Sequence, residues 1–161
     1  MSIRNLDALF APATIALIGA SNQAGSVGSV LARNLLESGF AGPILPVNPR
    51  ERAIRSTLSY RSIGELPFAP DLAVIATPPA TVPGLIGELG ARGCRAAVVI
   101  TAGFGEGERA EGEALRQAML DQAKPYLLRI VGPNCLGVLL PHIGINASFA
   151  HLSRCQAGSH S

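Results

Sequence analysis

The sequence predicts an α/β domain built on a doubly wound parallel sheet, and three observations carry the prediction. Five short runs are rich in apolar, often β-branched residues, and they are nearly continuous rather than alternating, as strands buried on both faces of a parallel sheet require. Segments with the apolar spacing of amphipathic helices lie between these runs. Strand and helix alternate along the chain, which predicts right-handed crossovers.

Each predicted element has its own signal. The expected strands cover 14–19, 44–47, 71–77, 96–101 and 129–132, with the run at 44–47 the weakest. The expected helices cover 27–38, 81–92 and 109–123. Gly39 and Gly93 follow the first two helices, as glycine commonly does at a helix end, and Pro125 prevents the third from continuing.

Length and composition favour one globular domain. The 161 residues suffice for a single core, and 48% hydrophobic against 15% charged residues excludes a disordered chain. We expect the domain to span 1–149, followed at 150–161 by a small, polar segment without periodicity that we interpret as a truncated or disordered tail or linker. A net charge of +2 is too weak to indicate nucleic acid or a membrane as a partner.

The cysteines indicate a reducing compartment. Cys94, Cys135 and Cys155 fit neither the paired spacing of a zinc site nor an even-numbered disulfide framework, and the three histidines have no metal-ligand spacing. No signal peptide and no apolar run long enough to span a bilayer is visible. We therefore expect a cytoplasmic protein with no metal and no membrane partner.

The loop after the first predicted strand is a candidate anion site. Ligands of open parallel sheets bind outside the carboxyl ends of the strands. There a run of small residues leads directly into a helix, whose free N–H groups and dipole favour a phosphate; the candidate contacts are Gly19, Ser21, Asn22, Gln23, Gly25 and Val27. The run matches neither G-x-G-x-x-G nor a P-loop, and a plain tight turn is the alternative.

The tip of the second strand favours a phosphorylated ribose. An NAD site usually places a carboxylate there, whereas this chain has Asn48, Pro49 and Arg50, with Arg52 and Arg55 following. These arginines suit the 3′-phosphate of coenzyme A (CoA) or the 2′-phosphate of NADP. A solvated basic loop is the alternative.

The later loops border the same edge of the sheet. Candidate ligand contacts there are Thr77, Pro78, Thr101, Gly103 and Asn134. Cys135 follows Asn134; a catalytic thiol needs a nearby histidine or a basic neighbourhood, and His142 is the only histidine close to it in sequence, so we favour a buried small residue over a nucleophile. No catalytic residue is assigned.

Taken together, four segments resemble the CoA-binding domain of NDP-forming acyl-CoA synthetases and of the succinyl-CoA synthetase α subunit. They are IALIGASNQAGSVGSVLARNLLESGFAGPILPVNP, PDLAVIATPPATVP, AAVVITAGFGE and LRIVGPNCLGVLLPHIGINASF. The resemblance implies a Rossmann-like fold and CoA or acyl-CoA as ligand. The start, RNLDALFAPATIALIGAS, is similar to bacterial synthetases often fused to a protein acetyltransferase domain.

The resemblance also implies residue roles. Ser21, Asn22 and Gln23 would contact the CoA phosphates, with Asn48 and Pro49 beside the adenosine. Thr77 and Pro78 would line the nucleotide, and Asn134 the thiol end. A family lysine near the VNP loop has no lysine counterpart here, and Arg50 or Arg52 would replace it.

Catalysis in that family needs more than these segments. The synthetases relay phosphate through a histidine on a second subdomain and bind ATP with an ATP-grasp domain, and neither is recognised here. We expect an acid–thiol ligase as the parent type, no complete catalytic cycle from this chain alone, those further subdomains or a partner subunit as partners, and a homodimer as one option. The alternatives are an NADP-binding oxidoreductase fragment and a nucleotide-sensing regulatory module.

Overall fold

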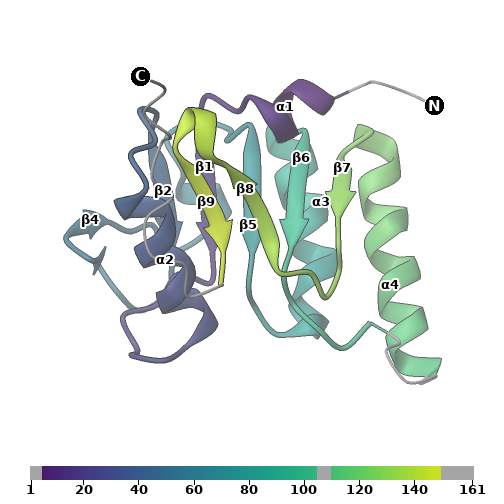
Figure 1. The fold of residues 1–161 in the computed structure, drawn as a ribbon. Helices are drawn as coiled ribbons and strands as arrows, with labels where there is room; N and C mark the ends of the chain where they lie inside the picture. Colours follow the sequence, from purple (N-terminus) through teal and green to yellow (C-terminus); the bar gives the residue numbers. More distant parts are fainter. Residues whose placement is uncertain (1–4, 105–109, 150–161) are drawn as a thin grey trace.

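The computed structural model describes residues 5–104 and 110–149, and its centre is a five-stranded parallel sheet (Figure 1). The strand order is β2-β1-β5-β6-β7. The strands are β1 (Ile15–Ile18), β2 (Ile44–Val47), β5 (Leu72–Ile75), β6 (Ala96–Val99) and β7 (Arg129–Val131). All five predicted strands are confirmed, as is the doubly wound α/β class, because β-branched and small apolar side chains fill both faces of a covered sheet.

Three long helices connect these strands. They are α2 (Val27–Glu37), α3 (Val82–Arg92) and α4 (Ala110–Ala123). The predicted ranges agree to within one residue at each described end, whereas Arg109 lies outside the described residues. Ser26 caps α2 by accepting a 3.1 Å hydrogen bond from the backbone N–H of Ser29, and Gly93 ends α3 with a φ of 100°.

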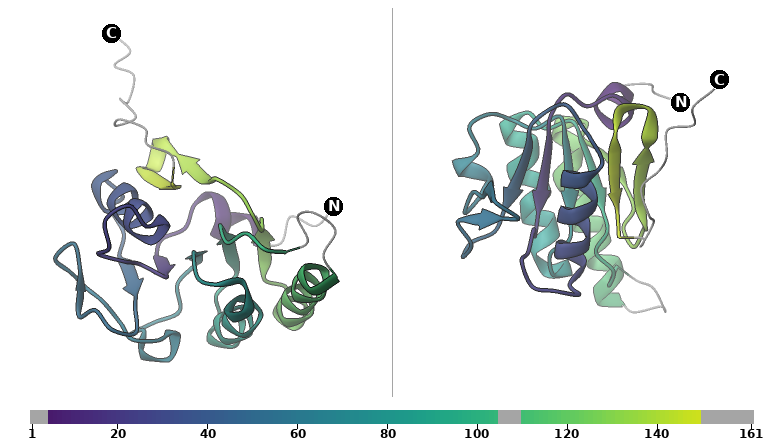
Figure 2. Two further views of the ribbon diagram at one scale, coloured as in Figure 1. Left: turned by 90° about the horizontal axis from the view of Figure 1, so that it is seen from below. Right: turned by 60° about the vertical axis from the view of Figure 1, so that its left-hand side comes forward.

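The sheet separates two layers of apolar packing. Figure 2 shows the elements on the two faces of the sheet from two further directions. Helices α3 and α4 cover one face together with the 3₁₀ turn η1 (Ile63–Glu65). The other face is covered by α2, by the short helix α1 (Leu6–Phe10) and by a hairpin of β8 (Gly137–Leu140) and β9 (Ile145–Ser148). The hairpin therefore occupies a position that a helix takes in many doubly wound sheets.

Several small elements have no counterpart in the sequence prediction. These are α1, the β8–β9 hairpin, four 3₁₀ turns and a second hairpin of β3 (Ala53–Ile54) and β4 (Thr57–Leu58). The β8–β9 hairpin is held to α2 by Asn34, whose buried amide donates a 2.7 Å hydrogen bond to the carbonyl of Ser148. This link joins residues 114 positions apart, so it belongs to the tertiary structure alone.

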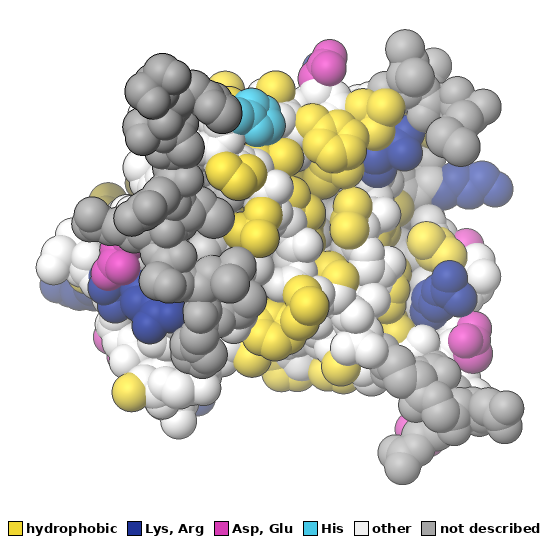
Figure 3. Space-filling model, in the orientation of Figure 1, with side chains coloured by type: hydrophobic (Ala, Val, Ile, Leu, Met, Phe, Trp, Pro, Cys, Tyr) yellow, Lys and Arg dark blue, Asp and Glu magenta, His cyan; other side chains and the backbone are white. Residues whose placement is uncertain are grey.

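The hairpin face also exposes apolar side chains, visible as yellow atoms across the centre of Figure 3. Leu136 is 67% exposed, Phe10 51% and Leu139 39%. Among the described residues no helix is long and apolar enough to cross a bilayer. The predicted tail at 150–161 lies outside the described residues.

Candidate functional site

The order of the strands creates a topological switch point at the carboxyl edge of the sheet. Counted along the chain, the five strands are arranged 2-1-3-4-5, so the connections leave β1 and β5 in opposite directions. Ligands of open α/β sheets bind at such a switch point, outside the carboxyl ends of the strands. The loops after β1 and β5 border this point, and the loops after β2, β6 and β7 continue the same edge.

The loop after β1 is shaped by backbone packing. Gly19 adopts a φ of 93°, and a Cβ there would lie 2.6 Å from the carbonyl oxygen of Ala76 after β5. A Cβ on Gly28 would collide with the carbonyl oxygen of Gly19. The first turn of α2 therefore packs directly on the end of β1, and the N–H groups of Val27 and Gly28 have no hydrogen-bond partner among the described residues.

Other residues of this loop are held locally. The hydroxyl of Ser21 accepts a 3.0 Å hydrogen bond from the N–H of Gln23, and the carbonyl of Gln23 accepts 3.1 Å and 2.8 Å bonds from the N–H and hydroxyl of Ser26. Gln23, Gly25 and Val27 are solvent-exposed, and Gly25 has a φ of 82°. The loop is thus preformed while its outer surface remains open to a ligand.

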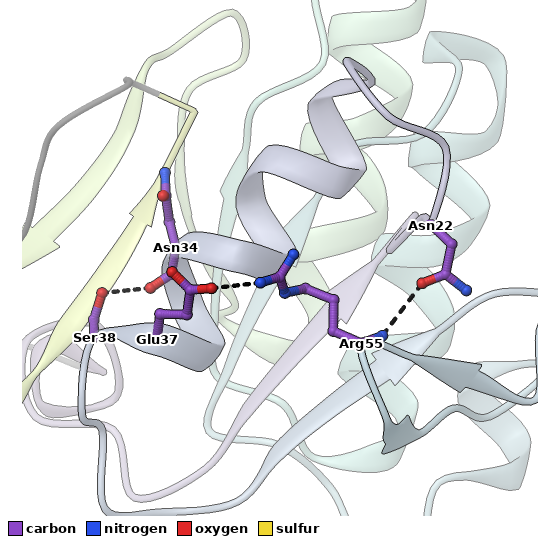
Figure 4. A network of polar contacts seen from close by, with 5 residues as sticks. All are labelled: Asn22, Asn34, Glu37, Ser38 and Arg55. Atoms are coloured by element: carbon purple, nitrogen blue, oxygen red, sulfur yellow. Dashed lines mark hydrogen bonds and ion pairs between the residues drawn. The ribbon is translucent and has the colours of Figure 1, made fainter.

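Asn22 faces the β3–β4 hairpin and bonds to it twice. Its amide nitrogen donates a 2.8 Å hydrogen bond to the carbonyl of Ala53, and its side-chain oxygen accepts a 3.2 Å bond from the N–H of Arg55. The guanidinium of Arg55 turns back to pair with Glu37 at the end of α2 (Figure 4). The guanidinium of Arg55 is therefore engaged by α2, whereas Asn22 links the glycine loop to the hairpin.

The tip of β2 is organised by Asn48. Its amide nitrogen donates a 2.8 Å hydrogen bond to the carbonyl of Ala20, and its side-chain oxygen accepts bonds from the N–H groups of Arg50 at 2.7 Å and Glu51 at 3.0 Å. Pro49 and Arg50 are solvent-exposed. The guanidinium of Arg50 has no hydrogen-bond or ion-pair partner within the described part of the chain, so it is available to an anion.

The remaining loops are joined in a row. The hydroxyl of Thr101 donates a 2.7 Å hydrogen bond to the carbonyl of Thr77, and the N–H of Asn134 donates a 2.9 Å bond to the carbonyl of Thr101. Thr77 also accepts a 2.7 Å bond from the hydroxyl of Thr81. Pro78 and Gly103 are exposed beside this row. The structure thus brings every predicted site residue to one edge of the sheet.

The chemistry of this edge suits the binding of phosphate groups. It offers a helix N-terminus, backbone N–H groups and a free arginine, all of which favour phosphate groups. The closely packed Gly19 and Gly28 leave no side chain between the loop backbone and a ligand. Within residues 5–104 and 110–149, no group of three or more His, Cys, Asp or Glu is placed to hold a metal ion. These features fit the pyrophosphate and the ribose phosphate of CoA.

The described thiols have no basic activating group. Cys135 lies at the carboxyl edge, where its thiol donates a 3.3 Å hydrogen bond to the carbonyl of Val99 and burial raises its pKa. His142 lies in η4 (Pro141–Ile143) beyond the other end of β8. Burial raises the pKa of Cys94 to about 12, and this residue borders a depression of about 340 Å³ at the opposite, amino edge of the sheet. None of the predicted ligand contacts lines that depression.

Sequence reasoning missed two contributors to this edge. The β3–β4 hairpin is hydrogen-bonded to the glycine loop through Asn22, and the hydroxyl of Thr81 donates a hydrogen bond to the hydroxyl of Thr77. The hairpin turn is formed by Arg55 and Ser56, with φ values of 48° and 67°. Such a turn usually carries Asn-Gly or Asp-Gly, so Arg-Ser supplied no turn signal. Thr81 supplied one weak signal, since threonine is common near the start of a helix.

Comparison with known proteins agrees with this geometry. A family model described as a CoA binding domain matches residues 13–141. The α subunit of the ADP-forming acetate–CoA ligase II of Pyrococcus furiosus is 39% identical over 150 residues, which are 92% of this chain and 32% of that protein. The ADP-forming acetate–CoA ligase of Methanocaldococcus jannaschii is 42% identical over 139 residues, 86% of this chain and 19% of that protein.

Solved structures give the same result. The PH0766 protein of Pyrococcus horikoshii superimposes with a TM-score of 0.86 at 36% identity, over 92% of this chain and 34% of that one. An acetyl-coenzyme A synthetase of Candidatus Korarchaeum cryptofilum superimposes with a TM-score of 0.83 at 38% identity, over 89% of this chain and 30% of that one. The chain spans at most about a third of these relatives. The family match over most of the sequence, on a fold whose carboxyl edge suits phosphates, shows that the chain belongs to the CoA-binding domain family and binds coenzyme A.

Proposed function

We propose that this chain is the coenzyme-binding part of an NDP-forming acyl-CoA synthetase. The observation that carries the proposal is that Asn48 joins the glycine loop, which leads into the N-terminus of α2, to the loop of Arg50, whose guanidinium is unpaired among the described residues. In this arrangement the glycine loop and the N–H groups of Val27 and Gly28 hold the CoA pyrophosphate, with Ser21 and Gln23 beside it. Arg50 meets the 3′-phosphate, and Pro49 and the backbone of Asn48 border the adenosine.

The row formed by the loops of Thr77, Thr101 and Asn134 receives the pantetheine arm of CoA. The loops of Thr77 and Pro78, of Thr101 and Gly103, and of Asn134 follow one another along the edge, so an extended arm lying along them places its thiol near Asn134. Bound CoA supplies the thiol that accepts an acyl group. We assign the binding and orientation of the coenzyme to this chain's own residues, and the transfer of phosphate and activation of the carboxylate to other domains.

The rest of the reaction requires other domains. Acyl-CoA formation driven by a nucleoside triphosphate needs a nucleotide-binding domain and a phosphate carrier, and we assign these to the ATP-grasp and phosphohistidine parts of the same enzyme. Phe10, Leu136 and Leu139 are exposed, and apolar side chains gather across the face shown in Figure 3. This surface suits a partner domain, because exposed apolar patches commonly mark an interface. A homodimer through this face is the competing arrangement. We place the enzyme in the cytoplasm, in keeping with the unpaired Cys94 and Cys135.

Calorimetric titration of the purified chain tests the proposal. The ligands are CoA, dephospho-CoA, which lacks the 3′-phosphate, and NADP; the variants are Arg50→Ala and, as a matched control, Arg95→Ala, an exposed arginine at the amino edge of the sheet. We expect CoA to bind more tightly than the other two ligands, and Arg50→Ala to weaken CoA by roughly three- to tenfold, the loss of one exposed charge-assisted contact. Equal binding of CoA and dephospho-CoA, or an equal effect of both arginine variants, would contradict the proposed 3′-phosphate contact.

A further inference from the structure

We propose that Asn48 is a positioning residue of the coenzyme site, whose side chain acts on the protein backbone and thereby sets the direction of Arg50. The inference rests on the proposed function, in which Arg50 meets the 3′-phosphate. It differs from the role that the resemblance implies for Asn48, a contact with the adenosine. The distinction depends on where the polar atoms of the Asn48 side chain are already used.

The hydrogen bonds of Asn48 are directed inward. Its side-chain oxygen accepts two bonds, from the N–H groups of Arg50 and Glu51, and its amide nitrogen donates one to the carbonyl of Ala20. An amide oxygen has two lone pairs and an amide nitrogen two hydrogens, so one N–H alone is left. The side chain is partly buried. The Asn48 side chain therefore holds the backbone of the site and has one N–H left for a ligand.

The backbone of Asn48 is anchored on the sheet. Its N–H donates a 2.9 Å hydrogen bond to the carbonyl of Tyr60, and the preceding residue, Val47, accepts a 3.1 Å bond from the N–H of Gly19. The following residues, Pro49 to Arg52, are all exposed, and among the described residues the N–H groups of Arg50 and Glu51 bond to the Asn48 side chain alone. The carbonyl of Arg52 accepts a 2.9 Å hydrogen bond from the N–H of Ser59. The Asn48 side chain thus fixes the start of this loop, where Arg50 lies, to the end of β2, while the bond to Arg52 fixes the end of the loop.

The same side chain couples two halves of the site. Through Ala20 it holds the loop of the pyrophosphate, and through Arg50 the loop of the 3′-phosphate. A side chain that bonds to backbone N–H groups two and three residues onward is a typical turn-forming use of asparagine. Because a flexible arginine loses freedom when it binds a phosphate, a fixed loop raises affinity by reducing that loss.

A double-mutant cycle tests the inference. The chains are wild type, Asn48→Ala, Arg50→Ala and the double variant, each titrated with CoA and dephospho-CoA, and the readout is the ratio of the two dissociation constants. We expect Asn48→Ala to weaken CoA by about tenfold and dephospho-CoA by only about twofold, because it loses both the turn and the link to Ala20. In a chain that already carries Arg50→Ala, adding Asn48→Ala should leave the ratio of the two dissociation constants unchanged.

Asn48→Ser provides the conservative comparison. A serine hydroxyl forms a weaker form of the same turn, carries no charge, and is too short to replace the bond to Ala20. We expect it to retain much of the preference for CoA, and thermal unfolding of each variant reports whether it is folded. If Asn48→Ala fails to fold, Asn48→Ser and its double variant with Arg50→Ala complete the cycle, with a partial loss of preference that again vanishes without Arg50.

The outcomes separate the inference from the proposed function. If Arg50→Ala abolishes the preference for CoA while Asn48→Ala leaves it intact, or if the two effects on the ratio add independently, the inference is wrong and the proposed function stands. If wild type shows no preference for CoA over dephospho-CoA, the 3′-phosphate contact itself fails and the inference fails with it. Loss of the preference in both single variants, without further loss in the double variant, supports it.

Discussion

Replacing Gly28 by alanine tests whether the contact between α2 and the end of β1 shapes the coenzyme site. The new Cβ would collide with the backbone carbonyl oxygen of Gly19 and lie 3.3 Å from the Cβ of Ser21. A backbone atom cannot rotate away as a flexible side chain can, so the start of α2 must move. Overpacking of this kind costs about 1–3 kcal/mol.

A smaller gain opposes this cost. Alanine is favoured over glycine in helices by up to about 1 kcal/mol, so the net destabilisation of Gly28→Ala should be about 1–2 kcal/mol. For a domain of this size that corresponds to a decrease in Tm of roughly 2–8 °C. Because the N–H groups of the same turn face the predicted phosphate site, we also expect CoA affinity to fall by about tenfold.

Gly84→Ala is the matched control. Gly84 also lies in the first turn of a helix, α3, but a Cβ there meets no heavy atom within 4 Å. The same substitution should therefore stabilise the chain by up to about 1 kcal/mol and leave CoA binding unchanged. Urea denaturation and calorimetric titration of both variants give the comparison. If Gly28→Ala proves as stable as Gly84→Ala and binds CoA like wild type, the proposed role of this contact is refuted.

Three further outcomes are expected. Asn34→Ala should lower the free energy of unfolding by about 1–3 kcal/mol in urea denaturation, because it leaves the buried carbonyl of Ser148 without its 2.7 Å donor; an unchanged midpoint would contradict this. Glu37→Gln should lower the free energy of unfolding by less than about 1 kcal/mol, since the ion pair with Arg55 is exposed. High salt should abolish this difference in stability between the variant and wild type. The folded pKa of Cys94, about 12, lies above its unfolded value, so its contribution to stability is present at neutral pH and is lost as the pH rises from about 9 towards 12. Wild type should therefore lose more stability than Cys94→Ala over that range, and a parallel loss in both would refute the assignment.

The main sheet was predictable because its signals are local. Five apolar runs and three segments with helical spacing identify the strands and long helices, since burial on both faces restricts the residue types within each run. The elements that were missed are short or depend on distant contacts. Helix α1 has five residues, fewer than two turns, and β3 and β4 have two residues each with no glycine in their turn. Neither length supports a recognisable periodicity.

Residue patterns along the chain were enough to predict the fold class and the loops that form the site, and the order of the motifs was enough to reveal the resemblance to CoA-binding domains. These patterns did not determine what each polar side chain does. Asn22 and Asn48 were both expected at the ligand, and the structure shows their amides bonded to the backbone of other loops, while Arg55 turns to Glu37 and Arg50 stays unpaired. Hydrogen bonds between segments 18 to 33 residues apart depend on how the chain folds back on itself, and only the tertiary structure decides which group finds a partner and which remains for the ligand.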